Sequence, residues 1–155
     1  MKEAPMTPDL TIRTVHPQDR ANWGQLYAGY AAFYQVEQTE AMRDMVWSWL
    51  HDPSHESQGL VAQSRSGQLL GLAHFRAFAR PLSASTGGFL DDLFVTPEAR
   101  GGKVGVALIA ALRTHAKAQG WSVLRWITAE NNYRARALYD TVATRTAWVT
   151  YDLKP

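Results

Sequence analysis

The residues from Arg100 to Gly105, Arg-Gly-Gly-Lys-Val-Gly, place three glycines and two cations just before an apolar helical segment. A glycine has no Cβ, so the backbone at such a position can approach a ligand closely. The free N–H groups of a first helical turn and the positive end of the helix dipole favour an anion there. Arg100 and Lys103 add positive charge. The pattern predicts a loop that binds phosphate or pyrophosphate, against the alternative of a tight turn with solvated cations.

Two common phosphate-binding loops do not fit this stretch. A P-loop needs Gly-Lys followed by Ser or Thr, which binds magnesium, whereas Val104 follows Lys103. A dinucleotide fingerprint needs the spacing G-x-G-x-x-G and an acidic residue about 20 positions later. Here the spacing is G-G-x-x-G, and residues 122–126 contain no acid. Both classes are therefore excluded.

The loop is similar to the signature of the GNAT acetyltransferases, Q/R-x-x-G-x-G/A, which follows a strand and opens the helix that cradles the pyrophosphate of acetyl-CoA. It matches that signature except that Lys103 stands where glycine is usual and Gly102 sits one place early. A second family motif, N-x-x-A-x-x-L-Y, is present as Asn132, Ala135, Leu138 and Tyr139. The specific match covers about residues 89–142, and the segment FLDDLFVTPEARG most resembles small polyamine and histone-type amine acetyltransferases.

This resemblance implies a single GNAT domain over residues 1–155. It also implies acetyl-CoA as co-substrate, no metal, and direct transfer of acetyl to a primary amine in a ternary complex. The cofactor-binding residues it implies are Phe94, Val95, Arg100, Gly101, Gly102, Lys103, Val104, Gly105, Val106, Asn132, Ala135 and Tyr139. A non-catalytic acyl-CoA-binding or sensing module is the alternative function, and a nucleic-acid-binding domain is a more remote one.

Tyr139 is the candidate general acid. It shares one helical face with Ala135, Leu138 and Val142, so it points inward beside the glycine loop. Acetyl transfer from a thioester expels a thiolate, and a phenol with a pKa of about 10 can protonate a thiolate whose thiol has a pKa of about 8.5. The resemblance implies that Tyr139 protonates the sulfur of coenzyme A. The alternative is a core tyrosine with a satisfied hydroxyl.

Asp91 and Asp92 are the candidate bases. Adjacent residues of a strand face opposite sides, so we expect one to face the substrate and the other a structural partner. The resemblance to polyamine acetyltransferases implies Asp91 as the base, acting through a water; the alternative is a pair of surface charges. It also implies that backbone near Phe94 or Val95 stabilises the oxyanion and pairs with the pantetheine arm as an added strand would.

The acceptor is expected to be a cationic small-molecule or peptide amine. Residues 1–99 hold 7 Lys/Arg against 11 Asp/Glu, and residues 100–155 hold 9 against 3, which gives −4 and +6 and the net charge of +2. Acids near the first two helices would attract an ammonium group, unless the charges are scattered by chance. The acids are Glu37, Glu40 and Asp44, and the aromatic side chains expected to bind substrate with Asp91 are Tyr27, Tyr30 and Tyr34.

The elements that must position these residues form a mixed α/β sheet with helices on both faces. Antiparallel strands come first, and a parallel β-α-β crossover surrounds the glycine loop. The expected strands are residues 10–14, 59–64, 68–80, 87–97, 121–128 and 146–153. The expected helices are residues 17–34, 39–50, the segment from the glycine loop to about Gln119, and 130–142. A lone terminal strand leaves an open edge, so we expect a homodimer.

Composition narrows the class of protein further. The chain has no cysteine, which excludes disulfides, thiolate metal sites and a cysteine nucleophile. Its longest apolar run, residues 104–112, is far too short to span a bilayer. The N-terminal stretch has no apolar signal core. A cytoplasmic protein that binds neither membrane nor nucleic acid is therefore expected.

Overall fold

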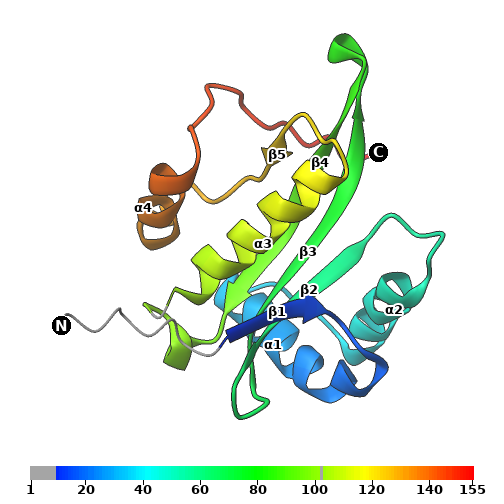
Figure 1. Cartoon of the computed structure of the whole chain (residues 1–155), viewed down its shortest axis with the longest axis vertical. Helices are drawn as coiled ribbons and strands as arrows, with labels where there is room; N and C mark the ends of the chain where they lie inside the picture. The colour runs from blue at the N-terminus through cyan, green and yellow to red at the C-terminus, as the bar shows by residue number, and fades with distance from the viewer. Residues whose placement is uncertain (1–9, 102) are drawn as a thin grey trace.

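The computed structural model describes residues 10–101 and 103–155, and its centre is a five-stranded sheet in the order β1-β2-β3-β4-β5 (Figure 1). The first four strands are antiparallel, and β5 runs parallel to β4. The strands are β1 Leu10–Thr14, β2 Gln58–Ser64, β3 Leu69–Arg80, β4 Ser85–Val95 and β5 Leu124–Arg125. The helices are α1 Arg20–Phe33, α2 Glu40–His51, α3 Val104–Ala118 and α4 Tyr133–Val142. This architecture confirms the predicted α/β class with a mixed sheet.

Helices cover both faces of the sheet, as predicted. Successive strand residues point to opposite faces, so Leu72 packs toward α1 and its neighbour Ala73 toward α3. The α3 side buries Ala62, Ala73, Phe75, Leu90, Val104, Leu108 and Leu112. The α1 side buries Trp23, Leu26, Val61, Leu69, Leu72 and Phe94, with Val46, Trp47 and Leu50 of α2 packed against them. Within the described ranges no helix is both long and apolar enough to cross a bilayer.

Local signals in the sequence account for several boundaries. Thr39 caps α2, since its hydroxyl accepts a hydrogen bond from the Met42 N–H at 3.2 Å. The β2–β3 hairpin turns at Gly67, which has a φ of 90°. The chain leaves α3 through Gly120, whose φ of 68° suits the left-handed end of a helix.

The last two predicted strands are the places where the sequence prediction was wrong. Of residues 121–128, only Leu124 and Arg125 form a strand, although the Ser122 N–H and the Val123 carbonyl also make hydrogen bonds to β4. Residues 146–153 form no strand at all. A strand needs a neighbour for its backbone hydrogen bonds, and propensity alone does not supply one.

Candidate active site

A cleft of about 570 Å³ lies where the end of β4, the start of α3 and helix α4 meet. Its walls include Val95, Arg100, Gly101, Lys103, Val104, Gly105, Val106, Asn132, Ala135 and Tyr139, all predicted to bind cofactor. Phe94 is buried in the α1-side core and does not line it. Gly102 lies outside the described residues. The two sequence motifs, about 30 residues apart in the chain, thus share one cleft.

The glycine loop turns sharply before α3 begins. Gly101 has a φ of 85°, and Lys103, the N-cap of α3, has a φ of 66°. Residues other than glycine rarely adopt this left-handed backbone conformation, because it costs them about 1–2 kcal/mol per residue. The left-handed backbone at position 103 therefore explains why the family signature usually has glycine there. Lys103 keeps the same backbone shape under strain and adds a cation to the cleft.

Gly105 lines the cleft from the first turn of α3. A Cβ at this position would lie 3.4 Å from Leu138 Cδ2 and 3.8 Å from Val95 Cγ2. The N–H groups in the first turn of α3 have no acceptor within the helix, so they are available to an anion. Arg100, Lys103 and Arg134 supply positive charge along the same walls. This donor set and the open backbone suit a pyrophosphate, and the apolar Leu93, Val95 and Ala99 suit an alkyl arm.

Tyr139 faces this cleft from α4. Its ring packs edge-on against Trp126, with the centroids 5.4 Å apart. Burial, together with the charge of the neighbouring Tyr34, raises the pKa of Tyr139 to about 12. The phenol therefore keeps its proton at any physiological pH.

Asn132 holds the start of α4 in place. Its Oδ1 accepts a hydrogen bond from the Ala135 N–H at 3.4 Å and so caps the helix. Its Nδ2 donates to the Tyr34 hydroxyl at 3.4 Å, which links α4 to the end of α1. Tyr34, predicted to bind substrate, thus lies in the wall of the predicted cofactor cleft.

Asp91 and Asp92 sit at a β-bulge, and the prediction that they face opposite sides was wrong. The β3–β4 register shifts there, so that His74 pairs with Asp92 but Phe75 pairs with Leu90. Asp91 is the extra residue. It lies 3.2 Å from Arg76, and Asp92 lies 2.8 Å from His74. Since His74 and Arg76 are two apart on β3, both carboxylates turn to the α1 face.

The bulge gives the two carboxyl groups different proton affinities. Burial raises the pKa of Asp91, although Arg76 opposes this. Burial acts in the same direction on Asp92, but the hydrogen bond and charge of His74 and the hydroxyls of Tyr27 and Tyr30 outweigh it and hold the pKa of Asp92 below its usual range. Asp91 is therefore the better proton acceptor of the two near neutral pH.

The comparisons with known proteins agree with this geometry. A family model described as the acetyltransferase (GNAT) family matches residues 23–142. The chain belongs to the GNAT acetyltransferase family. It is 27% identical over 143 residues to the D-amino-acid N-acetyltransferase HPA3 of Saccharomyces cerevisiae, covering 92% of this chain and 89% of that one. It is 29% identical over 132 residues to the uncharacterized N-acetyltransferase YhfO of Bacillus subtilis, covering 84% and 87%. The chain is thus an acetyltransferase, as predicted.

A solved relative shows the same fold. The structure of AAC(6')-Iy with the bisubstrate analogue CoA-S-monomethyl-acetylneamine superimposes with a TM-score of 0.79, at 19% identity, over 94% of this chain and 98% of that one. This likeness supports the assignment of this chain to the GNAT fold. Membership of the family implies that the chain uses acetyl-CoA.

A buried hydrogen-bonded chain, which sequence reasoning missed, runs behind the bulge of this acetyltransferase. Trp23 Nε1–H donates to His74 Nε2 at 3.0 Å, and His74 Nδ1 lies 2.8 Å from Asp92 Oδ2. The Tyr27 hydroxyl donates to the same Asp92 oxygen at 2.9 Å. Only the stretch LLGLAHFRAF, in which His74 and Arg76 are the two polar residues among apolar ones, could have singled out His74. Tyr27, one of the predicted substrate residues, is thus bound to Asp92.

The acidic residues near α2 have partners of their own. Arg20 lies 2.5 Å from Glu40 and 2.6 Å from Asp44, and Arg43 lies 2.8 Å from Glu40. These ion pairs neutralise two of the three acids expected to attract the acceptor, and Glu37 is exposed beside them. At the bulge, Asp91 and Asp92 are paired likewise, with Arg76 and His74 respectively.

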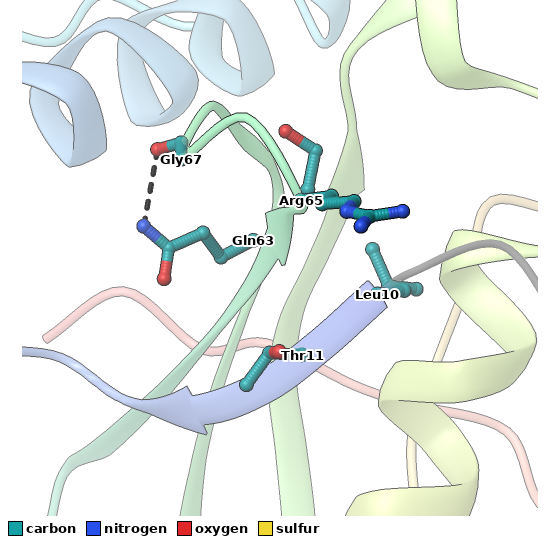
Figure 2. A pocket seen from close by; sticks show the side chains of 6 residues that line it. Leu10, Thr11, Gln63, Arg65 and Gly67 are labelled. Carbon is teal, nitrogen blue, oxygen red and sulfur yellow. Dashed lines mark hydrogen bonds between the residues drawn. The ribbon is translucent and has the colours of Figure 1, made fainter.

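A second hollow, of about 470 Å³, lies beside the β2–β3 turn (Figure 2). Gln63 donates there to the Gly67 carbonyl at 3.1 Å, and Leu10, Thr11 and Arg65 complete the lining that Figure 2 labels. None of the predicted site residues lies in it. In the part of the chain that the structure describes, no group of three or more His, Asp or Glu side chains is arranged to hold a metal ion.

Proposed function

We propose that this enzyme transfers the acetyl group of acetyl-CoA to a primary amine by direct attack in a ternary complex. The observation that carries the proposal is the single cleft that joins the glycine loop to Tyr139. The pyrophosphate would lie on the first turn of α3, with Arg100 and Lys103 beside it. The pantetheine arm would follow the backbone at Val95 as an added strand.

The amine attacks the thioester carbonyl, and a C–N bond forms as the carbonyl oxygen becomes an oxyanion. Asp91 takes the amine proton through a water, a role supported by its raised pKa. The C–S bond then breaks with its electron pair on sulfur. Tyr139, which holds its proton firmly, donates to that sulfur as charge develops.

The acceptor is proposed to be a cationic amine. Support comes from two carboxylates on one face at the bulge, with Tyr27 and Tyr30 packed against Asp92. A buried negative charge draws an ammonium group from solution, and salt screens that attraction at exposed approaches. The similar yeast enzyme is named for D-amino acids, which also present a primary ammonium.

Initial rates with acetyl-CoA test this function. Polyamines, lysine peptides, D-amino acids, aminoglycosides and neutral aryl amines are compared at two ionic strengths, with release of coenzyme A as the readout. Cationic amines should react best, with KM values that rise with salt. A preference for neutral aryl amines without a salt effect would mean that the aromatic side chains select the acceptor. Failure of every amine while acetyl-CoA still binds would favour the acyl-CoA-sensing alternative.

A further inference from the structure

Helix α4 carries the candidate general acid but is held by few contacts with the rest of the molecule. None of its residues, Tyr133–Val142, is fully buried. Figure 1 shows this helix, in orange, to one side of the sheet. Its contacts with other elements are side-chain packing, such as the edge-on contact of Tyr139 with Trp126. A proton donor is effective only when its position is closely fixed, so a helix held in this way needs an anchor.

One hydrogen bond provides such an anchor. Asn132, the N-cap of α4, donates from Nδ2 to the Tyr34 hydroxyl at 3.4 Å. Among the residues that the structure describes, this is the only hydrogen bond that joins α4 or its cap to a residue distant in the chain. The same Nδ2 also lies 3.5 Å from Thr128 Oγ1, but that residue belongs to the loop just before the helix. The polar link between α4 and α1 therefore depends on Tyr34.

Tyr34 is itself firmly held at the end of α1. Its backbone N–H donates to the Tyr30 carbonyl at 3.2 Å. Its ring lies against the ring of Tyr30, with the centroids 5.0 Å apart. Tyr30 in turn packs edge-on against Phe94, which is buried in the α1-side core, at 5.9 Å. Contacts thus run without a break from the core of the sheet to the side chain of Tyr34.

Helix geometry connects the anchored cap to the general acid. Tyr139 lies about two turns, or roughly 10 Å, beyond Asn132. A long side chain on a helix leans toward the N-terminus of that helix, so Tyr139 reaches back toward the cap. Tyr34 and Tyr139 both line the cleft. The contribution of Tyr34 to the raised pKa of Tyr139 agrees with this proximity.

We propose that Tyr34 is a positioning residue for acetyl transfer: its hydroxyl, bound to Asn132, fixes where α4 presents Tyr139 to the sulfur of coenzyme A. Tyr34 donates no proton to the reacting atoms in this role. The proton still passes from Tyr139 to sulfur as the C–S bond breaks with its electron pair on sulfur. This inference rests on the proposed function, in which Tyr139 is the general acid.

Hydrogen exchange of the free chain, followed by mass spectrometry, tests the anchor without any reaction. Tyr34→Phe keeps the ring against Tyr30 and removes only the hydroxyl. Amides of α4 should then exchange about 3- to 10-fold faster, the effect of losing one neutral hydrogen bond. Thr128→Val is the matched control, because it removes the other hydroxyl near Asn132 Nδ2 and leaves the link to α1 intact. Exchange in α4 that is unchanged in Tyr34→Phe, or equally fast in both variants, would overturn the proposal.

Steady-state rates test the catalytic consequence, with acetyl-CoA and whichever of the amines compared above reacts fastest. In Tyr34→Phe, kcat should fall about 3- to 10-fold while the KM for the amine stays within about twofold. In Thr128→Val, kcat should stay within about twofold of wild type. A higher KM for the amine with an unchanged kcat in Tyr34→Phe would make Tyr34 an acceptor-binding residue instead and contradict its positioning role.

A double-mutant cycle separates positioning of the acid from a general structural effect. If Tyr34 acts through Tyr139, its hydroxyl matters only while the Tyr139 hydroxyl is present. Adding Tyr34→Phe to Tyr139→Phe should therefore change kcat by less than about twofold. The loss in Tyr34→Phe should also ease with thioesters whose leaving thiol is more acidic, because they need less proton donation. Losses that multiply in the double variant, or that are equal for all thioesters, would rule out action through Tyr139.

The single variants distinguish a failure of this inference from a failure of the proposed function. A slow Tyr139→Phe enzyme together with a Tyr34→Phe enzyme at the wild-type rate would leave Tyr139 as the acid and overturn only the positioning role. Tyr139→Phe at the wild-type rate would overturn the general acid and the positioning role together.

Discussion

His74 Nδ1 lies 2.8 Å from Asp92 Oδ2, and this contact fixes the proton on the imidazole. Because Trp23 Nε1–H donates to the opposite ring nitrogen, that nitrogen accepts and Nδ1 carries the hydrogen. His74 Nδ1–H then donates to the carboxylate of Asp92. The carboxylate is largely buried but well supplied with donors, and it holds the hydroxyls of Tyr27 and Tyr30.

Replacing Asp91 or Asp92 by asparagine should have different effects on stability and on activity. The Asp92 carboxylate accepts hydrogen bonds from several buried donors, and in Asp92→Asn one of its two accepting oxygens becomes a donating NH₂ group. This change should lower the free energy of unfolding by about 1–3 kcal/mol. Asp91→Asn removes a carboxylate whose pKa is raised by burial, so unfolding at pH 7 should be unchanged or slightly more difficult. That same change should reduce kcat/KM by about 10²–10⁴-fold. Urea unfolding and steady-state rates measure both. A stable, fully active Asp91→Asn enzyme would assign the base elsewhere.

The ion pair between Arg13 and Asp19 should make the stability of the folded protein depend on pH. Their side chains lie 2.7 Å apart, and the Arg13 hydrogen bond holds the pKa of Asp19 below its usual value. A carboxyl with a lowered folded pKa stabilises the protein above its unfolded pKa of about 3.9 and loses that contribution as pH falls through the folded value. Asp19→Asn should therefore be less stable than wild type at pH 6, with a gap that narrows toward pH 3. Urea unfolding across this range checks it, with Asp140→Asn on an exposed face of α4 as control.

The sequence predicted most of the fold and the cleft because those features follow from local patterns. The glycine loop, the helix after it and the motif that begins at Asn132 each depend on a short stretch of chain. The bulge at Asp91 could not be predicted in this way, because a shift in register between two strands does not show in the types of the residues. Residues 146–153 alternate correctly for a strand, but only a neighbouring strand would make them one. The errors thus lie where structure depends on partners distant in the chain or outside it.

Tyr139→Phe should lose turnover without losing acetyl-CoA affinity. The ring keeps its packing on Trp126, so only the proton donor is removed. We expect kcat to fall by about 10²–10⁴-fold, and less with thioesters whose leaving thiol is more acidic. Isothermal titration and initial rates measure the two effects. Tyr133→Phe removes a hydroxyl from an exposed position of the same helix and should act like wild type. Equal rates for Tyr139→Phe and Tyr133→Phe would mean that Tyr139 only packs in the structure and donates no proton.

Gly105→Val should abolish the thermal stabilisation that acetyl-CoA gives. A ligand that binds only the native state stabilises it by about 2.7 kcal/mol at a hundredfold excess over Kd. A valine here would crowd Leu138 and Val95 in the wall of the cleft, beside the first turn of α3 where the pyrophosphate would lie. Ala110→Val puts the same side chain on an exposed position of α3 and should leave the ligand shift intact. A normal shift in Gly105→Val would show that acetyl-CoA binds away from the first turn of α3.

Lys103 should show opposite effects on stability and on affinity. Lys103→Gly relieves the left-handed strain of about 1–2 kcal/mol, less the roughly 0.4–1 kcal/mol that glycine's freedom adds to the unfolded chain. The variant should therefore be as stable as wild type or up to about 1.5 kcal/mol more stable. It should bind acetyl-CoA more weakly, with a shallower dependence on salt, because one cation beside the pyrophosphate is gone. Lys103→Ala loses the same charge but keeps the strain, so it should match the weaker affinity without the gain in stability. Urea unfolding and titrations at two salt concentrations separate the two effects, and unchanged affinity in both variants would place the phosphates away from residue 103.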